Sequence, residues 1–344
     1  MKFFILHGTG GDPDGNWFPW LKQKLEEQGH DVVVPGFPGM EEQSLETWMD
    51  TFDQYRDEFS DDTVFIAHSV APAFVLNLLE QGVEAEACFF VSGFTGLLGN
   101  KFDEPNKTIA DRDFDFEEIK VNCSYFKLYH GPDDPYVPME KAENLAENLG
   151  AEVEVIEDGG HLNEPSGYTE FPKLLEAIET FSEDYSWTEE ALFEAEKAMD
   201  NGELPIGAVV VSGGEEVSRA QSRTSREKIT SEHAEMVAVR KAGNLWDKEK
   251  LTLYTTLQPC VMCLATAIRC GIDRVVYAMK AENEVSTEAL PDLKKHGADI
   301  PEVTSGIREQ ESVKMFEQFM EEKKHHFARD YVRKLMKPYQ HQGR

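Results

Sequence analysis

The chain has 344 residues, 40% of them hydrophobic, so it is long enough for two domains, each with an ordinary buried core. No run reaches the roughly 18 apolar residues of a membrane-spanning helix. The five cysteines are too few, and odd in number, for a disulfide framework. We therefore expect a cytoplasmic protein without a membrane partner.

The net charge of −31 is distributed unevenly along the chain. Residues 1–185 contain 11 Lys and Arg against 39 Asp and Glu, a balance of −28, and the remainder carries only −3. Such asymmetry favours two domains, which we place at 1–184 and 185–344. The acidic half should repel nucleic acid, so a polyanionic partner would bind the second half.

Short β-rich segments alternate with amphipathic segments through the first half. Strands are expected at 2–6, 31–35, 63–68, 86–93, 125–131 and 153–158, and helices at 16–29, 72–82, 139–150 and 170–181. This alternation predicts an α/β fold with a parallel, doubly wound sheet.

Ser69 lies in "AHSVA", between an expected strand and an expected helix, where α/β-hydrolases have a nucleophile elbow. The usual pattern is G-x-S-x-G, and alanines replace both glycines here. Asp134 and His161 follow later strands, so the chain order is Ser, Asp, His, as in α/β-hydrolase triads. We expect Ser69 to be the nucleophile, His161 the general base and acid, and Asp134 the residue that orients the imidazole.

The loop "HGTGG" after the first strand is expected to supply the backbone N–H of Thr9 as an oxyanion donor, together with that of Val70. With "DDPYVP" and "GGHLNEPSG", this half resembles the small serine hydrolases of the retinoblastoma-binding-protein type. The resemblance implies an α/β-hydrolase domain with esterase-like activity and favours Asp134 over Asp133. The acidic segment 94–118 is expected to border the pocket. The alternative is a degraded site in a domain retained for binding.

The pattern restarts near residue 185. Ser186 and Glu189 form a capping-box pattern that predicts the start of a helix. Residues 205–220 then predict two strands joined by a Gly-Gly turn.

The segment "PCVMC" contains Cys260 and Cys263, a spacing shared by redox dithiols, zinc sites and ordinary packing. Upstream, His233 and Glu235 complete the H-x-E…P-C-x-x-C pattern of zinc nucleobase deaminases. Three protein ligands, His233, Cys260 and Cys263, leave one position on zinc open for water. We expect one Zn²⁺ per chain, with Glu235 moving protons during catalysis.

Other features of this segment are also predicted. Pro259 is expected in the first turn of the helix, and Cys270 is expected to be a small buried hydrophobic residue at its end.

Residues 187–320 resemble the cytidine-deaminase superfamily, most closely the tRNA adenosine deaminases and related nucleoside and guanine deaminases. The matching stretches are "LPIGAVVV", "HAE", "TLYTTLQPCVMC" and "RVVYA". The resemblance implies a cytidine-deaminase-like α/β/α domain. We expect Ser222 and Ala234 to bind the substrate and this domain to form a homodimer.

The sequence departs from the tRNA adenosine deaminases at three places. Ser222 stands near the position of their base-contacting Asn, Gln258 replaces the Glu before Pro-Cys, and "MKAENEVSTEAL" replaces an Asp-rich segment. The basic tail from Lys323 could contact RNA or form a solvated helix. We expect a bifunctional enzyme that deaminates a base, nucleoside or nucleotide. The alternative is a tRNA adenosine-to-inosine deaminase with an inactive hydrolase-fold binding domain.

Overall fold

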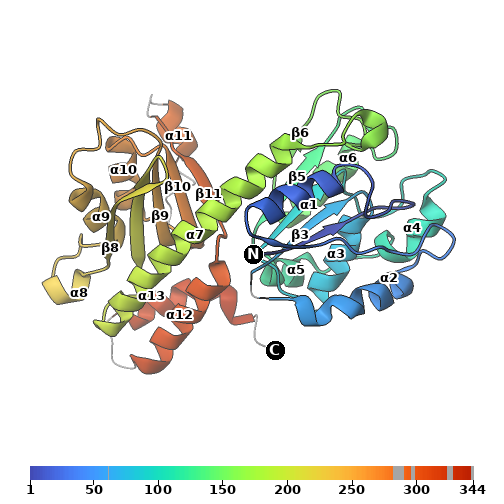
Figure 1. Cartoon of the computed structure of the whole chain (residues 1–344). Helices are drawn as coiled ribbons and strands as arrows, with labels where there is room; N and C mark the ends of the chain where they lie inside the picture. The colour runs from blue at the N-terminus through green and yellow to red at the C-terminus, as the bar shows by residue number, and fades with distance from the viewer. Residues whose placement is uncertain (61, 282–289, 296–298, 324–327, 342–344) are drawn as a thin grey trace. The chain divides into compact units, whose positions relative to one another are not determined.

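The computed structural model describes residues 1–344 except 61, 282–289, 296–298, 324–327 and 342–344. The segment that follows "RVVYA" and the start of the basic tail therefore lie largely outside the described residues. The chain divides into two compact units, Met1–Ala177 and Ile178–Arg344 (Figure 1). The division falls several residues before 184/185, so the predicted domain limits stay a prediction.

The division lies within a single helix, α7 (Pro172–Asp200). The predicted helix start at Ser186 is therefore wrong. Residues 173–200 contain neither glycine nor proline, so nothing interrupts the helix. The Ser186 hydroxyl donates to the carbonyl of Ser182 one turn earlier instead of capping a helix.

The described part of the first unit contains a six-stranded sheet in the order β2-β1-β3-β4-β5-β6, with every neighbouring pair parallel. The parallel α/β fold predicted for this half is confirmed. The strands are β1 (Lys2–Leu6), β2 (Asp31–Val33), β3 (Thr63–His68), β4 (Ala87–Val91), β5 (Phe126–His130) and β6 (Val153–Val155). The helices are α1 (Phe18–Glu27), α2 (Leu45–Phe52), α3 (Ala71–Glu80), α4 (Asp103–Ala110), α5 (Phe116–Asn122) and α6 (Met139–Leu149).

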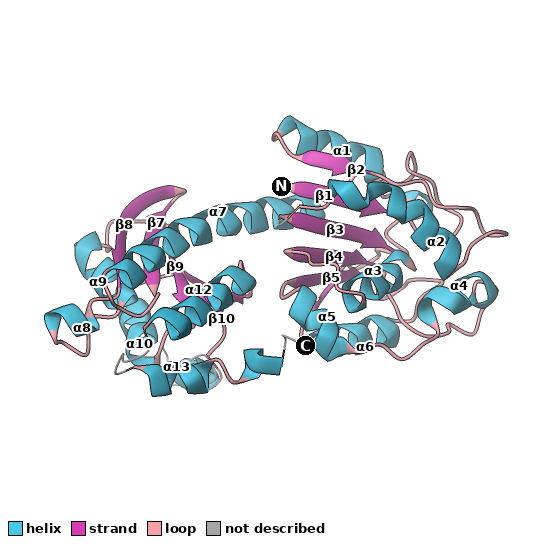
Figure 2. Cartoon of the chain, turned by 90° about the horizontal axis from the view of Figure 1, so that it is seen from below, coloured by secondary structure: helices cyan, strands magenta, loops and turns pink. Residues whose placement is uncertain are grey.

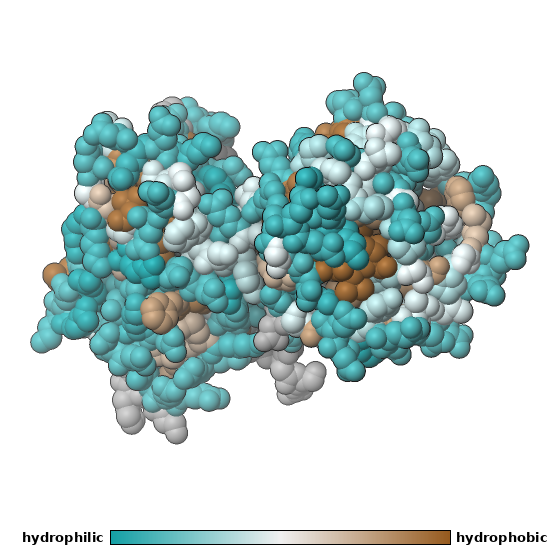
Figure 3. Space-filling view, in the orientation of Figure 1, coloured by the Kyte–Doolittle hydropathy of each residue, from teal (hydrophilic) through white to brown (hydrophobic). Residues whose placement is uncertain are grey.

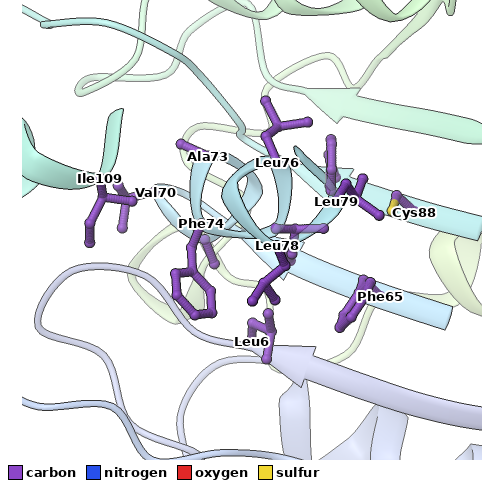
Figure 4. Packing of buried hydrophobic residues seen from close by; sticks show 14 of the residues in the cluster. Leu6, Phe65, Val70, Ala73, Phe74, Leu76, Leu78, Leu79, Cys88 and Ile109 are labelled. Atoms are coloured by element: carbon purple, nitrogen blue, oxygen red, sulfur yellow. The ribbon is translucent and has the colours of Figure 1, made fainter. Parts of the chain in front are cut away.

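Helix α3 packs against one face of this sheet and contributes many of the buried side chains there. All its residues from Ala71 to Leu79 are buried, and Figure 4 shows Phe74 and Leu78 on the side of Leu6 and Phe65. Burial of each such large side chain contributes roughly 1.5–3 kcal/mol. The helix that follows Ser69 is therefore firmly anchored to the sheet.

The described part of the second unit contains a five-stranded sheet in the order β11-β10-β9-β7-β8, of which Figure 2 labels β10, β9, β7 and β8. β9, β10 and β11 are parallel, and β7 is antiparallel to β8 and β9. The strands are β7 (Gly207–Ser212), β8 (Glu215–Gln221), β9 (Leu251–Leu257), β10 (Arg274–Met279) and β11 (Glu302–Ser305). The β7–β8 pairing confirms the predicted hairpin, and its turn residues Gly213 and Gly214 both have positive φ.

Helices cover both faces of the second sheet. The described helices of this unit that follow α7 are α8 (Thr224–Glu227), α9 (Ala234–Ala242), α10 (Val261–Arg269), α11 (Leu290–Lys295), α12 (Glu309–Glu322) and α13 (Arg329–Leu335). Val237 of α9 and Leu264 of α10 belong to one apolar cluster, and Phe316 of α12 and Leu335 of α13 belong to another. The α/β/α prediction is confirmed.

Two local predictions near "PCVMC" are wrong. Cys260 is the N-cap of α10, so Pro259 precedes the helix instead of lying in its first turn. Cys270 is the C-cap and is only half-buried.

The face shown in Figure 3 is mostly hydrophilic, with small apolar patches. Among the described helices, none has the length and apolar character needed to cross a membrane.

Candidate active sites

Ser69 lies in a strained turn between β3 and α3. Its φ is +64°, in the left-handed region that costs a non-glycine residue roughly 1–2 kcal/mol. The Ser69 N–H donates to the carbonyl of Val91 at 2.9 Å. A Cβ on Gly8 would lie only 2.5 Å from the Ser69 Cβ, so the turn needs glycine there. This backbone is that of a nucleophile elbow, although alanines flank the serine.

Ser69, His161 and Asp134 form one hydrogen-bonded chain. His161 Nε2 lies 3.1 Å from Ser69 Oγ, and His161 Nδ1 lies 2.7 Å from Asp134 Oδ2. Asp134 Oδ1 accepts from the backbone N–H groups of Tyr136 and Val137. Burial alone would raise the pKa of Asp134, but hydrogen bonds from His161 and these N–H groups hold the pKa below its usual value.

The neighbouring carboxylate of Asp133 has a different partner. Its Oδ1 accepts from the backbone N–H of Gly160 at 2.9 Å. Of the two aspartates, Asp134 is therefore the one that contacts the His161 ring.

Two buried histidines that the sequence analysis did not identify form hydrogen bonds with backbone groups of the loops around Ser69. His68 Nε2 lies 2.9 Å from the carbonyl oxygen of His161, and because a carbonyl only accepts, Nε2 carries the proton. Burial lowers the pKa of His68 to about 3, so the ring is neutral. His7 accepts from the Phe37 N–H and donates through Nδ1 to the carbonyl of Gly8. Their positions in the sequence could have identified them, because His7 directly follows β1 and His68 is the last residue of β3.

A cavity of about 250 Å³ opens over Ser69. Phe94, Leu98 and Phe102 form apolar walls, so the segment 94–118 borders the pocket as predicted. Across the part of the chain that the structure describes, no group accepts a hydrogen bond from the backbone N–H of Thr9 or Val70. Both N–H groups are therefore available to a ligand.

The second site is built at two helix starts. His233 is the N-cap of α9, Cys260 is the N-cap of α10, and Cys263 lies in the first turn of α10. The Cys260 and Cys263 Sγ atoms are 3.6 Å apart, and they lie 3.6 Å and 3.5 Å from His233 Nδ1. Tetrahedral ligands at the usual Zn–S and Zn–N bond lengths are separated by about 3.5–3.8 Å. These donors therefore fit a zinc ion.

The electrostatics of the thiol pair also suit a cation. The hydrogen bond from Cys263 lowers the pKa of Cys260 to about 4, and the same contact raises the pKa of Cys263. The partial positive charge of the helix N-terminus also favours a thiolate at Cys260.

Glu235 lies beside these donors in the first turn of α9 and is buried. Its Oε2 has no hydrogen-bond partner within the described ranges. Burial raises the pKa of this carboxyl group. A buried acid with a free oxygen at a cavity is a candidate proton carrier.

Glu235 lines a cavity of about 440 Å³ together with Ser222 and Gln258. Ala234 is fully buried and does not line the cavity with its side chain, so its predicted role stays a prediction. Gln258 Oε1 accepts from the backbone N–H of Ala281, which gives this side chain a structural contact. The sequence analysis missed several lining residues, among them the polar Thr224, Thr230 and Tyr331, and only the H-x-E pattern nearby pointed to this region.

The two units thus define two classes of enzyme fold, one with a serine–histidine–aspartate chain and one with a His-Cys-Cys cluster beside a buried glutamate. The chain belongs to the serine hydrolase family, whose model matches residues 3–180. Its second unit carries the cytidine and deoxycytidylate deaminase zinc-binding region, matched over residues 181–279. The expected fusion is confirmed.

Individual relatives match one half each. The YdeN hydrolase of Bacillus subtilis is 26% identical over 187 residues, which cover 52% of this chain and 95% of YdeN. A tRNA-specific adenosine deaminase of the same organism is 35% identical over 149 residues, covering 41% of this chain and 91% of that protein. The crystal structure of the B. subtilis ydeN product matches with a TM-score of 0.49 and 26% identity, over 52% of this chain and 97% of that one.

Proposed function

We propose that the protein is a bifunctional enzyme. Its first unit is a Ser-His-Asp serine hydrolase, and its second unit is a zinc-dependent hydrolytic deaminase of a nucleobase in a base, nucleoside or nucleotide. The observation that carries the proposal is that each unit holds its own complete set of reactive groups. A cytoplasmic location and a homodimer formed through the second unit stay predictions.

In the first unit, His161 Nε2 takes the proton of Ser69 as its Oγ attacks an acyl carbon. Asp134 holds Nδ1 protonated and faces the imidazolium that forms. The N–H groups of Thr9 and Val70 would then bind the developing oxyanion. His161 returns the proton to the leaving group and repeats both transfers with water.

In the second unit, His233, Cys260 and Cys263 would hold zinc, which acts when bound as a Lewis acid that supplies a nucleophile near neutral pH. Glu235 Oε2 would take one proton from the attacking water and deliver it to the ring nitrogen of the base. It would then take the second proton of that water, from the new hydroxyl group, and deliver it to the departing amine, which leaves as ammonia while the carbonyl forms. Ser222 and Ala234 would orient the base. The cavity volume falls in the range of small-ligand pockets.

The test uses the full chain with two readouts. We expect a fluorophosphonate to label wild-type protein but not Ser69→Ala. We expect ammonia release from at least one member of a panel of bases, nucleosides and nucleotides, lost in the isosteric Glu235→Gln. A wild-type protein that never labels would refute the hydrolase half. Ammonia release that persists in Glu235→Gln would refute the role of that residue.

A second candidate substrate is tRNA, favoured by the relatives named tRNA-specific adenosine deaminases. Arg333 in α13 and Lys337 just after this helix are exposed cations, and Tyr331 of the same helix lines the cavity beside Glu235. Deleting the tail is a poor test, because Leu335 and Met336 are buried in the apolar cluster that includes Phe316. Arg333→Gln with Lys337→Gln removes charge without opening that cluster.

The matched control is Lys22→Gln with Lys24→Gln, which removes two exposed charges from the first unit. If tRNA is the substrate, the α13 variant should lower its deamination and weaken the dependence on salt, and the control should not. If small substrates react and tRNA does not, the first candidate holds.

A further inference from the structure

Asn106, in α4 of the hydrolase unit, has an amide group whose orientation is fixed by its neighbours. Gln43 Nε2 lies 3.2 Å from the carbonyl oxygen of Pro105, which can only accept, so this atom of Gln43 is the donor. The same nitrogen lies 2.7 Å from Asn106 Oδ1, which therefore is the oxygen. The Thr9 hydroxyl also donates to Asn106 Oδ1.

This arrangement directs the Asn106 nitrogen away from Gln43 and Thr9. Asn106 is only 4% exposed, yet it lines the cavity over Ser69. Nδ2 has no acceptor among the residues that the structure describes. It is also absent from the polar atoms sealed from solvent without a partner, so it opens on the cavity.

The surroundings of this donor are apolar. Leu98 and Phe102 come from the same segment and form the adjoining walls. A buried amide N–H without an acceptor is costly, and a ligand oxygen would satisfy it. The oxyanion already has the backbone donors of Thr9 and Val70, which leaves the Asn106 amide for another oxygen of the substrate.

We infer that Asn106 Nδ2 donates to an oxygen on the acyl chain of the substrate, so that the hydrolase unit selects short acyl groups carrying such an acceptor. The cavity of about 250 Å³ limits the length of the chain. This inference rests on the proposed serine hydrolase function of the first unit.

The test compares p-nitrophenyl methoxyacetate with p-nitrophenyl butyrate, which differ only by an ether oxygen in place of a methylene. The measured quantity is the ratio of their kcat/KM values, because the intrinsic reactivity of the two esters cancels between variants. Asn106→Asp keeps an oxygen that accepts from Gln43 and Thr9, replaces the N–H donors with a second acceptor oxygen and adds a negative charge, whose effect on the oxyanion is the same for both esters and cancels in the ratio. Asn106→Leu removes both, and Phe102→Leu changes an apolar wall as the control.

We expect both Asn106 variants to lower the ratio about 3- to 10-fold, and Phe102→Leu to change both esters by a similar factor. If both esters lose the same factor in Asn106→Asp, the residue has an oxyanion or packing role and the inference is overturned. Fluorophosphonate labelling of each variant reports on Ser69 separately. Wild-type protein that fails to label would refute the underlying hydrolase function instead.

Discussion

Gly8 determines whether Ser69 can keep its left-handed backbone. A Cβ at position 8 would lie 2.5 Å from the Ser69 Cβ and 3.0 Å from the carbonyl oxygen of His68. We expect Gly8→Ala to reduce the rate of fluorophosphonate labelling at least tenfold and to lower the free energy of unfolding by about 1–3 kcal/mol. Gly39→Ala is the control, since nothing lies within 4 Å of a Cβ there. Equal labelling of the two variants would contradict this account of the elbow.

His68 makes the stability of the hydrolase unit sensitive to acid. Because burial lowers its pKa from 6.5 to about 3, the unfolded chain takes up a proton that the folded chain does not bind until about pH 3. The free energy of unfolding therefore falls as pH drops below 6.5, by up to about 1.4 kcal/mol per pH unit from this residue.

We expect His68→Gln to flatten this dependence between pH 6 and pH 4, measured by urea unfolding at each pH. The other histidines with lowered pKa values, the buried His7 and His130 and the half-buried His30, remain in both proteins and cancel in the difference. Parallel curves for the two proteins would show that His68 titrates normally in the folded state.

At the scale of residues, sequence patterns could predict groups that follow strands, because parallel strands bring their carboxyl ends to one edge of the sheet. Ser69, Asp134 and His161 were predicted in this way, and the structure brings their side chains together. Asn106 and Gln43 were not, because their roles depend on contacts between residues 63 and 97 positions apart in the chain. No local pattern encodes such a contact.

At the scale of elements, the zinc donors depend on where two helices begin. Cys260 is the N-cap of α10 and Cys263 lies in its first turn, whereas Cys270 caps its far end. We expect about one zinc per wild-type chain by elemental analysis, and much less in Cys260→Ala and Cys263→Ala. Cys270→Ala is the matched control and should retain full zinc. Equal zinc in all three variants would exclude this cluster as the site.

Element limits were predicted well where glycine or strand alternation marks them, as at the Gly213–Gly214 turn. The prediction failed at Ser186, because the serine and glutamate of a capping-box pattern can also occur inside a helix. A serine caps a helix only if the chain before it leaves the helical conformation. Residues 173–185 contain neither glycine nor proline, so the chain before Ser186 stays helical and α7 continues through it.

At the scale of the whole molecule, each unit has its own sheet and its own apolar clusters, so each should fold and react largely by itself. The uneven net charge of the sequence indicated this division. A net charge of −28 in one half and −3 in the other is not expected of two halves that share one core.

This separation leads to a test with metal removal. A chelator should abolish ammonia release, because a zinc site contributes both chemistry and folding energy to the unit that holds it. The rate of fluorophosphonate labelling at Ser69 should stay within about twofold, since His233, Cys260 and Cys263 all belong to the other unit. Ser69→Ala should show the reverse, with deamination retained and labelling lost. Restoring Zn²⁺ serves as the control for damage by the chelator. A chelated protein that also loses labelling would show that the hydrolase unit depends on the folded deaminase unit, contrary to the independence argued from their separate cores.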